Sequence, residues 1–321
     1  MKEGDFQRLL WSFGQHRVLT VASRTGILGA LDSGGGTVEE ISKRLGLDPL
    51  ATGKIVRALC AMSVSVPDGD GYRIDPGLAG MFAPGPDDFG HFLEHSHQMY
   101  ERWGESLEPW VRGEQWKTRS RDPEGLARFG AAMRAAATRA AAAVTEVIDL
   151  GGVGTMLDVG GGTGAYSMAF CKAAPGVRAT VIDTPEVASL GREQAAEAGM
   201  GKRVEFRGGD YADPALYEGG FDLVLIANVL HQERADRAAK LVSLGAGALN
   251  PGGRLAVIDF AIDDEGRQSL VGALFAINMR SFGDTHTAPA IRGWMESAGL
   301  SGFEREDFAG SRWLLMARKT A

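Results

Sequence analysis

The sequence predicts an α/β fold: a doubly wound, mainly parallel sheet in the second half, preceded by a smaller, mostly helical domain. From residue 151 onward, apolar runs of strand length alternate with helical segments, near 155–159, 179–182, 203–207, 221–227 and 253–260. The first of these runs enters a glycine-rich turn and then a helix, which is the order of a nucleotide-binding unit. Such alternation implies parallel strands, with ligands at their carboxyl ends. A terminal pair near 303–308 and 312–317, turning at Gly310, is predicted to be antiparallel.

Composition limits the possible partners. The chain has 321 residues, enough for two domains, with 44% hydrophobic and 23% charged residues. A formal net charge of −7 argues against a nucleic-acid partner, which needs a basic face. Cys60 and Cys171 are far apart in the sequence and belong to no recognisable disulfide or metal motif. This favours a protein of the reducing cytoplasm. No apolar run approaches ~18 residues, so we expect no membrane association.

The first 85 residues predict a winged helix. Residues 6–31 have helical spacing, with these positions as expected core: Leu10, Val18, Val21, Ala22 and Leu28. Thr37 and Glu40 form a capping box for a second helix, Pro49 begins a third, and a turn at 67–71 predicts a hairpin. The third helix offers few cations for DNA, so we expect residues 1–85 to form a dimerisation domain.

Residues 86–150 are expected to form a helical connector between the two domains. Its run from 131 to 144 is nearly pure alanine, which favours a helix that other groups can approach closely. His91, His95 and His97 resemble a metal cluster, but no further ligand completes the spacing. We therefore predict no metal site.

The glycine turn carries the main functional signal. Gly160 and Gly162 follow the first strand, and a Cβ there would keep a ligand off the backbone. With Ala165 the pattern also satisfies a relaxed dinucleotide fingerprint. Asp158, inside the strand, suits a cationic ligand better than a pyrophosphate. Asp183 ends the next strand, where an acid accepts ribose hydroxyls, and this fits either kind of cofactor.

Three downstream segments decide between a dinucleotide and a cationic cofactor that also carries a ribose. They are 208–211, 221–231 and 249–259, each placed at a strand of the predicted sheet. At these spacings the series resembles class I S-adenosylmethionine-dependent methyltransferases, with a Rossmann-like sheet. With the winged helix and the alanine-rich helix, nearly the whole chain resembles the small-molecule O-methyltransferase family, which includes plant caffeate and bacterial antibiotic O-methyltransferases.

The resemblance implies roles for particular residues. Gly160 and Gly162 would form the cofactor loop, Asp183 would hold the ribose, and Asp210 and Tyr211 would flank the adenine. Phe129 and Met133 match a pair that closes over S-adenosylmethionine, and Asn228 either bonds the cofactor or satisfies local backbone. His231 matches the catalytic histidine, and Asp259 matches the acid that orients it. In the family an acid commonly follows the histidine, whereas this sequence has Gln232 at that position. The family also implies a homodimer, formed through residues 1–85.

The predicted activity is O-methylation of a small aromatic acceptor in secondary metabolism. Because an imidazole titrates near neutral pH, His231 is suited to deprotonate a phenol, with Asp259 fixing its tautomer. A helix over 270–282, containing Phe275 and Asn278, is expected to line the acceptor site. Two alternatives stay open: a carbon or nitrogen methyltransferase on the same scaffold, or a relative that binds the cofactor without methyl transfer.

Overall fold

The structure is a computed structural model that describes residues 2–114, 123–260, 262–263, 269–279, 283, 285–308 and 312–320. The chain folds as two compact units, Met1–Ala136 and Ala137–Ala321. The long helix α7 (Pro123–Val147) contributes its first half to one unit and its second half to the other. In the part of the chain that is described, no helix has the length and apolarity needed to cross a membrane.

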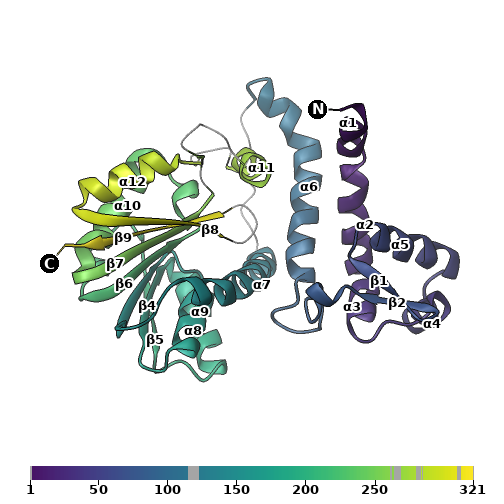
Figure 1. Ribbon diagram of the computed structural model, residues 1–321, viewed down its shortest axis with the longest axis horizontal. Coiled ribbons are helices and arrows are strands. Elements are labelled where there is room, and N and C mark those ends of the chain that lie inside the picture. The colour runs from purple at the N-terminus through teal and green to yellow at the C-terminus, as the bar shows by residue number, and fades with distance from the viewer. Residues whose placement is uncertain are drawn as a thin grey trace. The chain divides into compact units, whose positions relative to one another are not determined.

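The first unit combines helices with a two-stranded hairpin, in the order predicted from the sequence (Figure 1). Its remaining elements are α1 (Glu3–Leu10), α2 (Ser12–Arg24), α3 (Ile27–Asp32), α4 (Val38–Leu45), α5 (Pro49–Ala61), β1 (Ser65–Asp68), β2 (Gly71–Ile74), η1 (Pro76–Leu78) and α6 (Gly90–Val111). The capping box is present, since the Glu40 amide donates to Thr37 and the Thr37 amide donates to Glu40. The long helix α6 packs along α2.

The helical stretch predicted over 6–31 is interrupted twice. Trp11 separates α1 from α2, and Gly26 separates α2 from α3 with a φ of 80°, a left-handed conformation that glycine adopts readily. Leu10 was predicted in the core and this is wrong, because it is 58% exposed. Ala22 and Leu28 are buried as predicted. The break at Trp11 explains the error, since α1 lies outside the core that α2 and α3 build.

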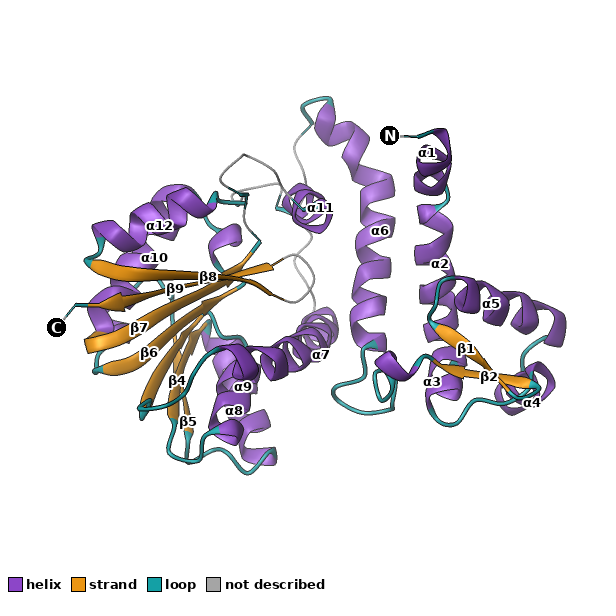
Figure 2. Ribbon diagram, viewed as in Figure 1, coloured by secondary structure: helices purple, strands orange, loops and turns teal. Residues whose placement is uncertain are grey.

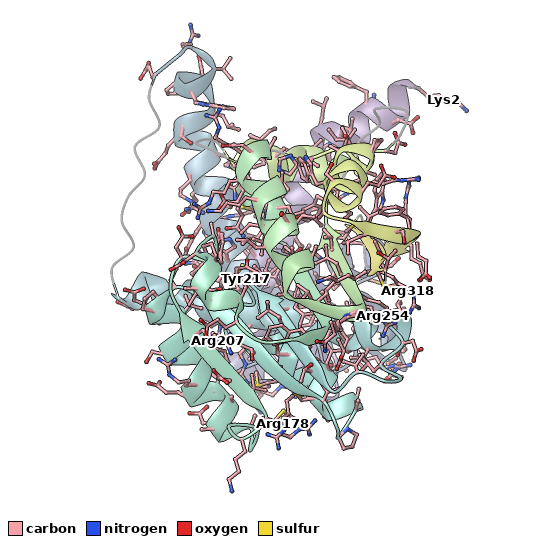
Figure 3. The ribbon with its side chains drawn as sticks, turned by 90° about the vertical axis from the view of Figure 1, so that its left-hand side faces the viewer. Lys2, Arg178, Arg207, Tyr217, Arg254 and Arg318 are labelled. Atoms are coloured by element: carbon pink, nitrogen blue, oxygen red, sulfur yellow. The ribbon has the colours of Figure 1, made fainter. Side chains whose placement is uncertain are left out.

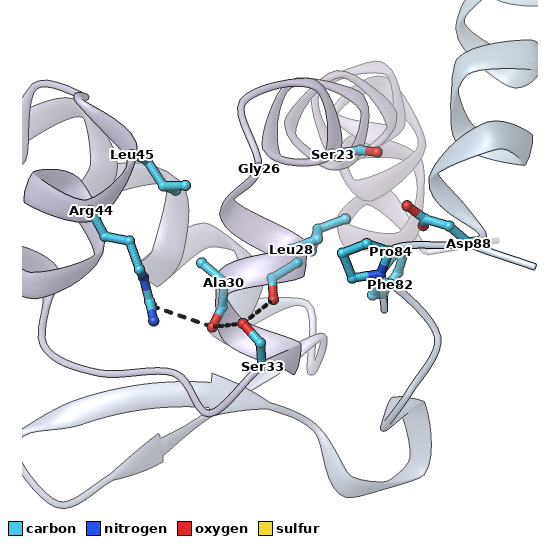
Figure 4. Close-up of a pocket in the computed structure, with 11 residues that line it drawn as sticks. Ser23, Gly26, Leu28, Ala30, Ser33, Arg44, Leu45, Phe82, Pro84 and Asp88 are labelled. Atoms are coloured by element: carbon cyan, nitrogen blue, oxygen red, sulfur yellow. Dashed lines mark hydrogen bonds between the residues drawn. The ribbon is translucent and has the colours of Figure 1, made fainter. Parts of the chain in front are cut away.

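A depression of about 330 Å³ lies beside α3 in the first unit (Figure 4). The Arg44 guanidinium donates to the carbonyls of Ala30 and Gly35, and the Ser33 hydroxyl donates to the Gly29 carbonyl. Its polar side chains therefore bond the local backbone. We assign the depression a structural role. It is the space left where α3, α4 and the segment around Phe82 pack together.

The second unit is a seven-stranded sheet covered by helices. Its elements are β3 (Thr155–Val159), α8 (Ala165–Ala173), β4 (Arg178–Asp183), α9 (Pro185–Glu197), β5 (Val204–Gly208), η2 (Pro214–Tyr217), β6 (Phe221–Ala227), η3 (Leu230–Gln232), α10 (Ala235–Ala248), β7 (Leu249–Asp259), α11 (Leu270–Asn278), α12 (Ala288–Ser297), β8 (Leu300–Phe308) and β9 (Arg312–Lys319). The strand order is β5-β4-β3-β6-β7-β9-β8. Figure 2 shows the strands fanned between two helical layers.

The predicted doubly wound fold is confirmed. Strands β3 to β7 are parallel and β8–β9 is an antiparallel pair. One core lies under α10 and α12, and the other lies under α8, α9 and the second half of α7. Strand β7 begins at Leu249, earlier than the predicted 253. The predicted helix over 270–282 runs to Asn278, and its predicted end at 282 and the turn at Gly310 lie outside the described residues.

The amino ends of the strands are closed by polar contacts within the fold. The Asp222 carboxylate accepts from the amides of Gly154 and Thr155, and Arg254 donates to the Asp149 carbonyl. Arg254 and Arg318 face each other across β7 and β9 (Figure 3). Apart from Phe129 and Met133 on α7, the candidate residues lie at or just after the carboxyl ends of the strands, so this edge of the sheet holds the site.

Candidate active site

The loop between β3 and α8 has the backbone that its glycines allow. Gly160 and Gly162 have φ values of 65° and 61°, which other residues adopt only with strain. A Cβ on Gly160 would lie 2.6 Å from the Val229 Cγ2 atom, so any larger residue at this position would clash with the Val229 side chain. A Cβ on Gly162 would meet no atom within 4 Å, so here the chain leaves open space above the backbone. The loop therefore presents an open backbone surface, which larger side chains at these two positions would block.

Asp158 lies beneath this loop as a buried acid with an unsatisfied oxygen. Its Oδ2 atom accepts from the Ser167 hydroxyl at 2.8 Å, while its buried Oδ1 atom has no hydrogen-bond partner among the described residues. Burial raises the pKa of Asp158 to about 7, against the smaller lowering by Ser167. A buried carboxylate oxygen without a donor is costly, by about 1–3 kcal/mol or more. A ligand that brings a donor or a positive charge would relieve that cost.

Asp183, at the end of β4, holds the loop from the side. Its Oδ2 atom accepts from the Gly162 amide at 2.9 Å, and its Oδ1 atom accepts from the Thr184 amide at 2.8 Å. Burial raises the pKa of Asp183, and the two amides oppose that shift. Each carboxylate oxygen keeps further lone pairs, so the position predicted for ribose hydroxyls is compatible with the geometry.

Asp210 and Tyr211 belong to a network that extends to α10. The Asp210 Oδ1 atom accepts from the Ala212 amide at 2.9 Å and from Arg237 at 2.6 Å. The Tyr211 hydroxyl donates to Glu233 at 2.6 Å, and Arg237 also pairs with Glu233 at 2.9 Å. The Ala212 amide and the Arg237 guanidinium hold the pKa of Asp210 below its usual value. The sequence did not predict Arg237 or Glu233, because both lie far along the chain from Asp210.

Asn228 follows β6 in an uncommon backbone conformation. Its φ is 57°, and strain of this kind is found at functional sites. Its side-chain amide donates to the Tyr166 hydroxyl at 3.4 Å, whereas its buried Oδ1 atom has no partner among the described residues. Burial raises the pKa of the Tyr166 hydroxyl, with the Arg312 guanidinium acting in the opposite direction. Tyr166 was not predicted as a site residue, although it directly follows the glycine turn.

His231 and Asp259 form a buried pair, as the sequence predicts. The His231 Nδ1 and Asp259 Oδ1 atoms are 2.5 Å apart, and the two side chains are 4% and 2% exposed. Asp259 also accepts from the backbone amides of His231 and Phe260. Both amides donate to this carboxylate, so it acts as an acceptor, and the Nδ1 atom of the imidazole can donate to it as well. In that tautomer the Nε2 atom is available to accept a proton.

Two neighbouring aromatic rings pack against the histidine. The Phe260 and Phe275 rings lie 5.8 Å and 4.9 Å from the His231 ring, and 4.7 Å from each other. Phe275 comes from α11, the helix predicted to line the acceptor site. His286 also lies close to this site, because its Nε2 atom is 3.0 Å from the carbonyl oxygen of Leu230, the residue before His231. An apolar ring beside a base suits an aromatic acceptor.

The remaining predicted positions lie in the first unit. Phe129 and Met133 are on α7, where the Phe129 ring lies 5.4 Å from the His95 ring. Their role in closing over a cofactor stays a prediction. His91, His95 and His97 are on α6, and no cluster able to hold a metal ion occurs among the described side chains.

A model of the O-methyltransferase domain matches residues 93–301 of the chain. The chain belongs to the O-methyltransferase family. The 3-hydroxy-5-methyl-1-naphthoate 3-O-methyltransferase of Streptomyces sahachiroi is 29% identical over 330 residues, covering 95% of this chain and 90% of the relative. The N,N-dimethyltransferase OxyT of Streptomyces rimosus is 27% identical over 331 residues, covering 97% of this chain and 95% of the relative. The structure of human N-acetylserotonin methyltransferase in complex with SAM is 20% identical, covers 100% of this chain and 99% of the other, and has a TM-score of 0.79.

Family membership confirms the enzyme class and cofactor that the glycine turn and its downstream segments predicted. This O-methyltransferase family member is an S-adenosylmethionine-dependent methyltransferase. The residues present fit that cofactor, because the loop leaves room above Gly162 and Asp158 offers a buried oxygen without a donor. Acids at Asp158, Asp183 and Asp210 suit a sulfonium and an ammonium better than the pyrophosphate of a dinucleotide.

Proposed function

We propose that the protein methylates a hydroxyl group of a small aromatic metabolite, with His231 as the general base. The observation that carries the proposal is the buried His231–Asp259 pair with two neighbouring aromatic rings, Phe260 and Phe275, packed against the imidazole. The naphthoate relative, named as a 3-O-methyltransferase, supports an aromatic hydroxyl acceptor.

The residues divide the work in the following way. Gly160, Gly162, Asp183, Asp210 and Tyr211 would hold S-adenosylmethionine, which supplies an electrophilic methyl group when bound. Asn228 would bond the same ligand through its unpartnered Oδ1 atom. Phe260 and Phe275 would orient the acceptor ring beside His231.

His231 then handles the proton. Its Nδ1–H bond to Asp259 directs Nε2 toward the acceptor hydroxyl, and Nε2 takes the phenolic proton as the oxygen becomes nucleophilic. The Asp259 carboxylate stabilises the imidazolium that forms, in the way an acid does in other His–Asp pairs. The buried setting strengthens this interaction, because little water screens it.

The test is the His231→Ala variant. Turnover should fall by roughly 10²–10⁴-fold, the usual contribution of a positioned base, and should recover partly at high pH, where the phenol ionises unaided. The dissociation constant for S-adenosylhomocysteine, measured by calorimetry, should stay unchanged and serves as the control for folding. Near-wild-type turnover at neutral pH would contradict the role of His231.

Transfer to nitrogen is the second candidate, because OxyT, named as an N,N-dimethyltransferase, matches 97% of the chain. An amine acceptor needs little help from a base when it is already neutral, so His231→Ala would then cost much less. Assaying matched phenols and anilines for S-adenosylhomocysteine release separates the two candidates.

We also propose that the protein forms a homodimer through residues 1–85. At the start of the chain, Leu10, Trp11 and Phe13 are 58%, 69% and 56% exposed, an apolar surface that water disfavours. Deleting residues 1–30 should yield monomeric or aggregated, inactive protein in light scattering. A monomeric full-length protein at micromolar concentration would contradict the proposal. A cytoplasmic location stays a prediction.

A further inference from the structure

Arg312 lies one aromatic ring away from the proposed base. It opens β9, which runs antiparallel to β7, so that Trp313 faces Asp259 and Arg312 lies beside Phe260. The Arg312 Cζ atom is 5.0 Å from the centroid of the Phe260 ring. The same ring packs against His231 at 5.8 Å. The guanidinium and the imidazole therefore border a common aromatic surface.

Among the described residues, the Arg312 guanidinium has no partner anion. Its Nε atom is buried without a hydrogen-bond partner there, and Arg312 forms no ion pair with a described side chain. The neighbouring acid is Asp259, which is already occupied by His231 and the Phe260 amide. The contact with Phe260 is a cation–π interaction, which leaves the buried Nε donor without a hydrogen bond.

Other groups at this edge of the sheet also have hydrogen-bonding capacity to spare. Tyr166, on α8, carries a hydroxyl whose pKa is raised by burial and lowered by the Arg312 guanidinium. That hydroxyl accepts from Asn228, and its own proton has no acceptor among the described residues. A guanidinium and a phenolic O–H are both donors that suit a planar oxyanion.

We propose that Arg312 binds a carboxylate carried by a ligand that lies against Phe260 beside His231. The inference rests on the proposed function, since it assigns a recognition group to the same site. The carboxylate could come from the aromatic acceptor, which would make the substrate a hydroxylated aromatic acid, or from the amino-acid end of the methyl donor. Both sources share the chemistry, and ligand binding separates them.

The experiment compares Arg312→Gln with Arg318→Gln. Arg318 is a matched control, because it lies on the same strand with the same charge but faces Arg254 at the opposite edge of the sheet (Figure 3). Calorimetry measures S-adenosylhomocysteine alone. It then measures 3-hydroxy-2-naphthoate and the corresponding carboxamide, each in the presence of saturating S-adenosylhomocysteine.

If the acceptor supplies the carboxylate, the wild type and Arg318→Gln should bind the acid about 10- to 100-fold more tightly than the amide. Arg312→Gln should lose that preference and keep its affinity for S-adenosylhomocysteine. If the methyl donor supplies the carboxylate, Arg312→Gln alone should bind S-adenosylhomocysteine about tenfold or more weakly.

The inference is overturned if Arg312→Gln changes neither the affinity for S-adenosylhomocysteine nor an acid preference. Arg312→Lys keeps the charge and should restore part of the affected binding, which distinguishes recognition from damage to the strand. These measurements need no turnover. A failure of the His231 assay together with an intact Arg312 effect would therefore overturn the proposed function alone, and the reverse pattern would overturn this inference alone.

Discussion

The two halves of the sheet's carboxyl edge are built in different ways. Over β3, β4 and β5 the site consists of a glycine backbone and three acids, Asp158, Asp183 and Asp210, each close in sequence to its own strand. Over β6, β7 and β9 it consists of a histidine, aromatic rings and a cation, brought together from segments far apart. The first half suits a cationic methyl donor, and the second suits an electron-rich or anionic acceptor. The first half is thus acidic, which suits its proposed cationic ligand, and the second half carries a cation, which suits an anionic ligand.

The largest effect confined to one half is expected for Asp259→Asn, which should act only on the half over β6, β7 and β9. An amide at this position no longer fixes the His231 tautomer or stabilises the imidazolium, so turnover should fall by roughly 10²-fold, less than for His231→Ala. Steady-state kinetics measures the loss. Asp236→Asn is the control, because that acid is 85% exposed on α10. A weakened affinity for S-adenosylhomocysteine in Asp259→Asn would show that the halves are not separable.

The matching change in the first half is Asp183→Ala. It removes the acceptor proposed for the ribose hydroxyls and the partner of the Gly162 amide, so the dissociation constant for S-adenosylhomocysteine should rise about 10- to 100-fold. Asp183→Asn, which still accepts the Gly162 amide, should lose less. Glu186→Ala, on the exposed first turn of α9, should bind as the wild type. Calorimetry that shows unchanged affinity for Asp183→Ala would contradict the ribose role.

The two halves also differ in how far the sequence predicts them. Gly160, Gly162 and Asp183 follow strands whose apolar patterns are clear, and strand ends meet at one edge of a parallel sheet. The family resemblance implied that Asp259 orients His231, and the structure brings the two side chains together. Arg312 was not predicted, since only the antiparallel register of β9 places its first residue beside Phe260. Arg237 was missed for the same reason: its partners depend on how α10 packs, which periodicity does not specify.

A smaller effect should come from Arg237, the cation in the first half. Arg237→Ala leaves Asp210 and Glu233 without their counter-ion, and Glu233 holds the Tyr211 hydroxyl. The affinity for S-adenosylhomocysteine should weaken about tenfold, since these pairs are partly exposed and each is worth little alone. Arg234→Ala removes a similar charge from the start of α10, where it only approaches Asp236 at 3.9 Å, and should have no effect.

A selective readout distinguishes positioning of Asp210 from a general loss of structure. S-inosylhomocysteine carries an oxygen where adenine carries its amino group, so it lacks the amino donor proposed for Asp210. Arg237→Ala should therefore weaken its binding less than that of S-adenosylhomocysteine. An equal loss for both ligands, or a loss in Arg234→Ala as well, would contradict a role through Asp210.

The smallest expected effect is a pH dependence from Asp158. Its pKa is raised to about 7 by burial, so in the free protein the carboxyl is mostly neutral at pH 6 and mostly ionised at pH 8. A ligand with an ammonium or sulfonium group prefers the ionised form, and binding should lower this pKa. S-adenosylmethionine should therefore bind about threefold more tightly at pH 8 than at pH 6, and Asp158→Asn should lose that trend.

Ionisation of Asp158 should favour ligand binding but should lower the stability of the free protein. Because the folded pKa lies above the unfolded value near 3.8, ionising Asp158 favours unfolding, and its contribution to stability is lost as pH rises from about 4 through 7. Without ligand, Asp158→Asn should therefore melt at a higher temperature than the wild type above pH 7, and the two should converge near pH 4. Thermal unfolding across this range measures the difference. A variant less stable than the wild type at pH 8 would show that the free carboxylate is already compensated, which the partnerless Oδ1 atom argues against.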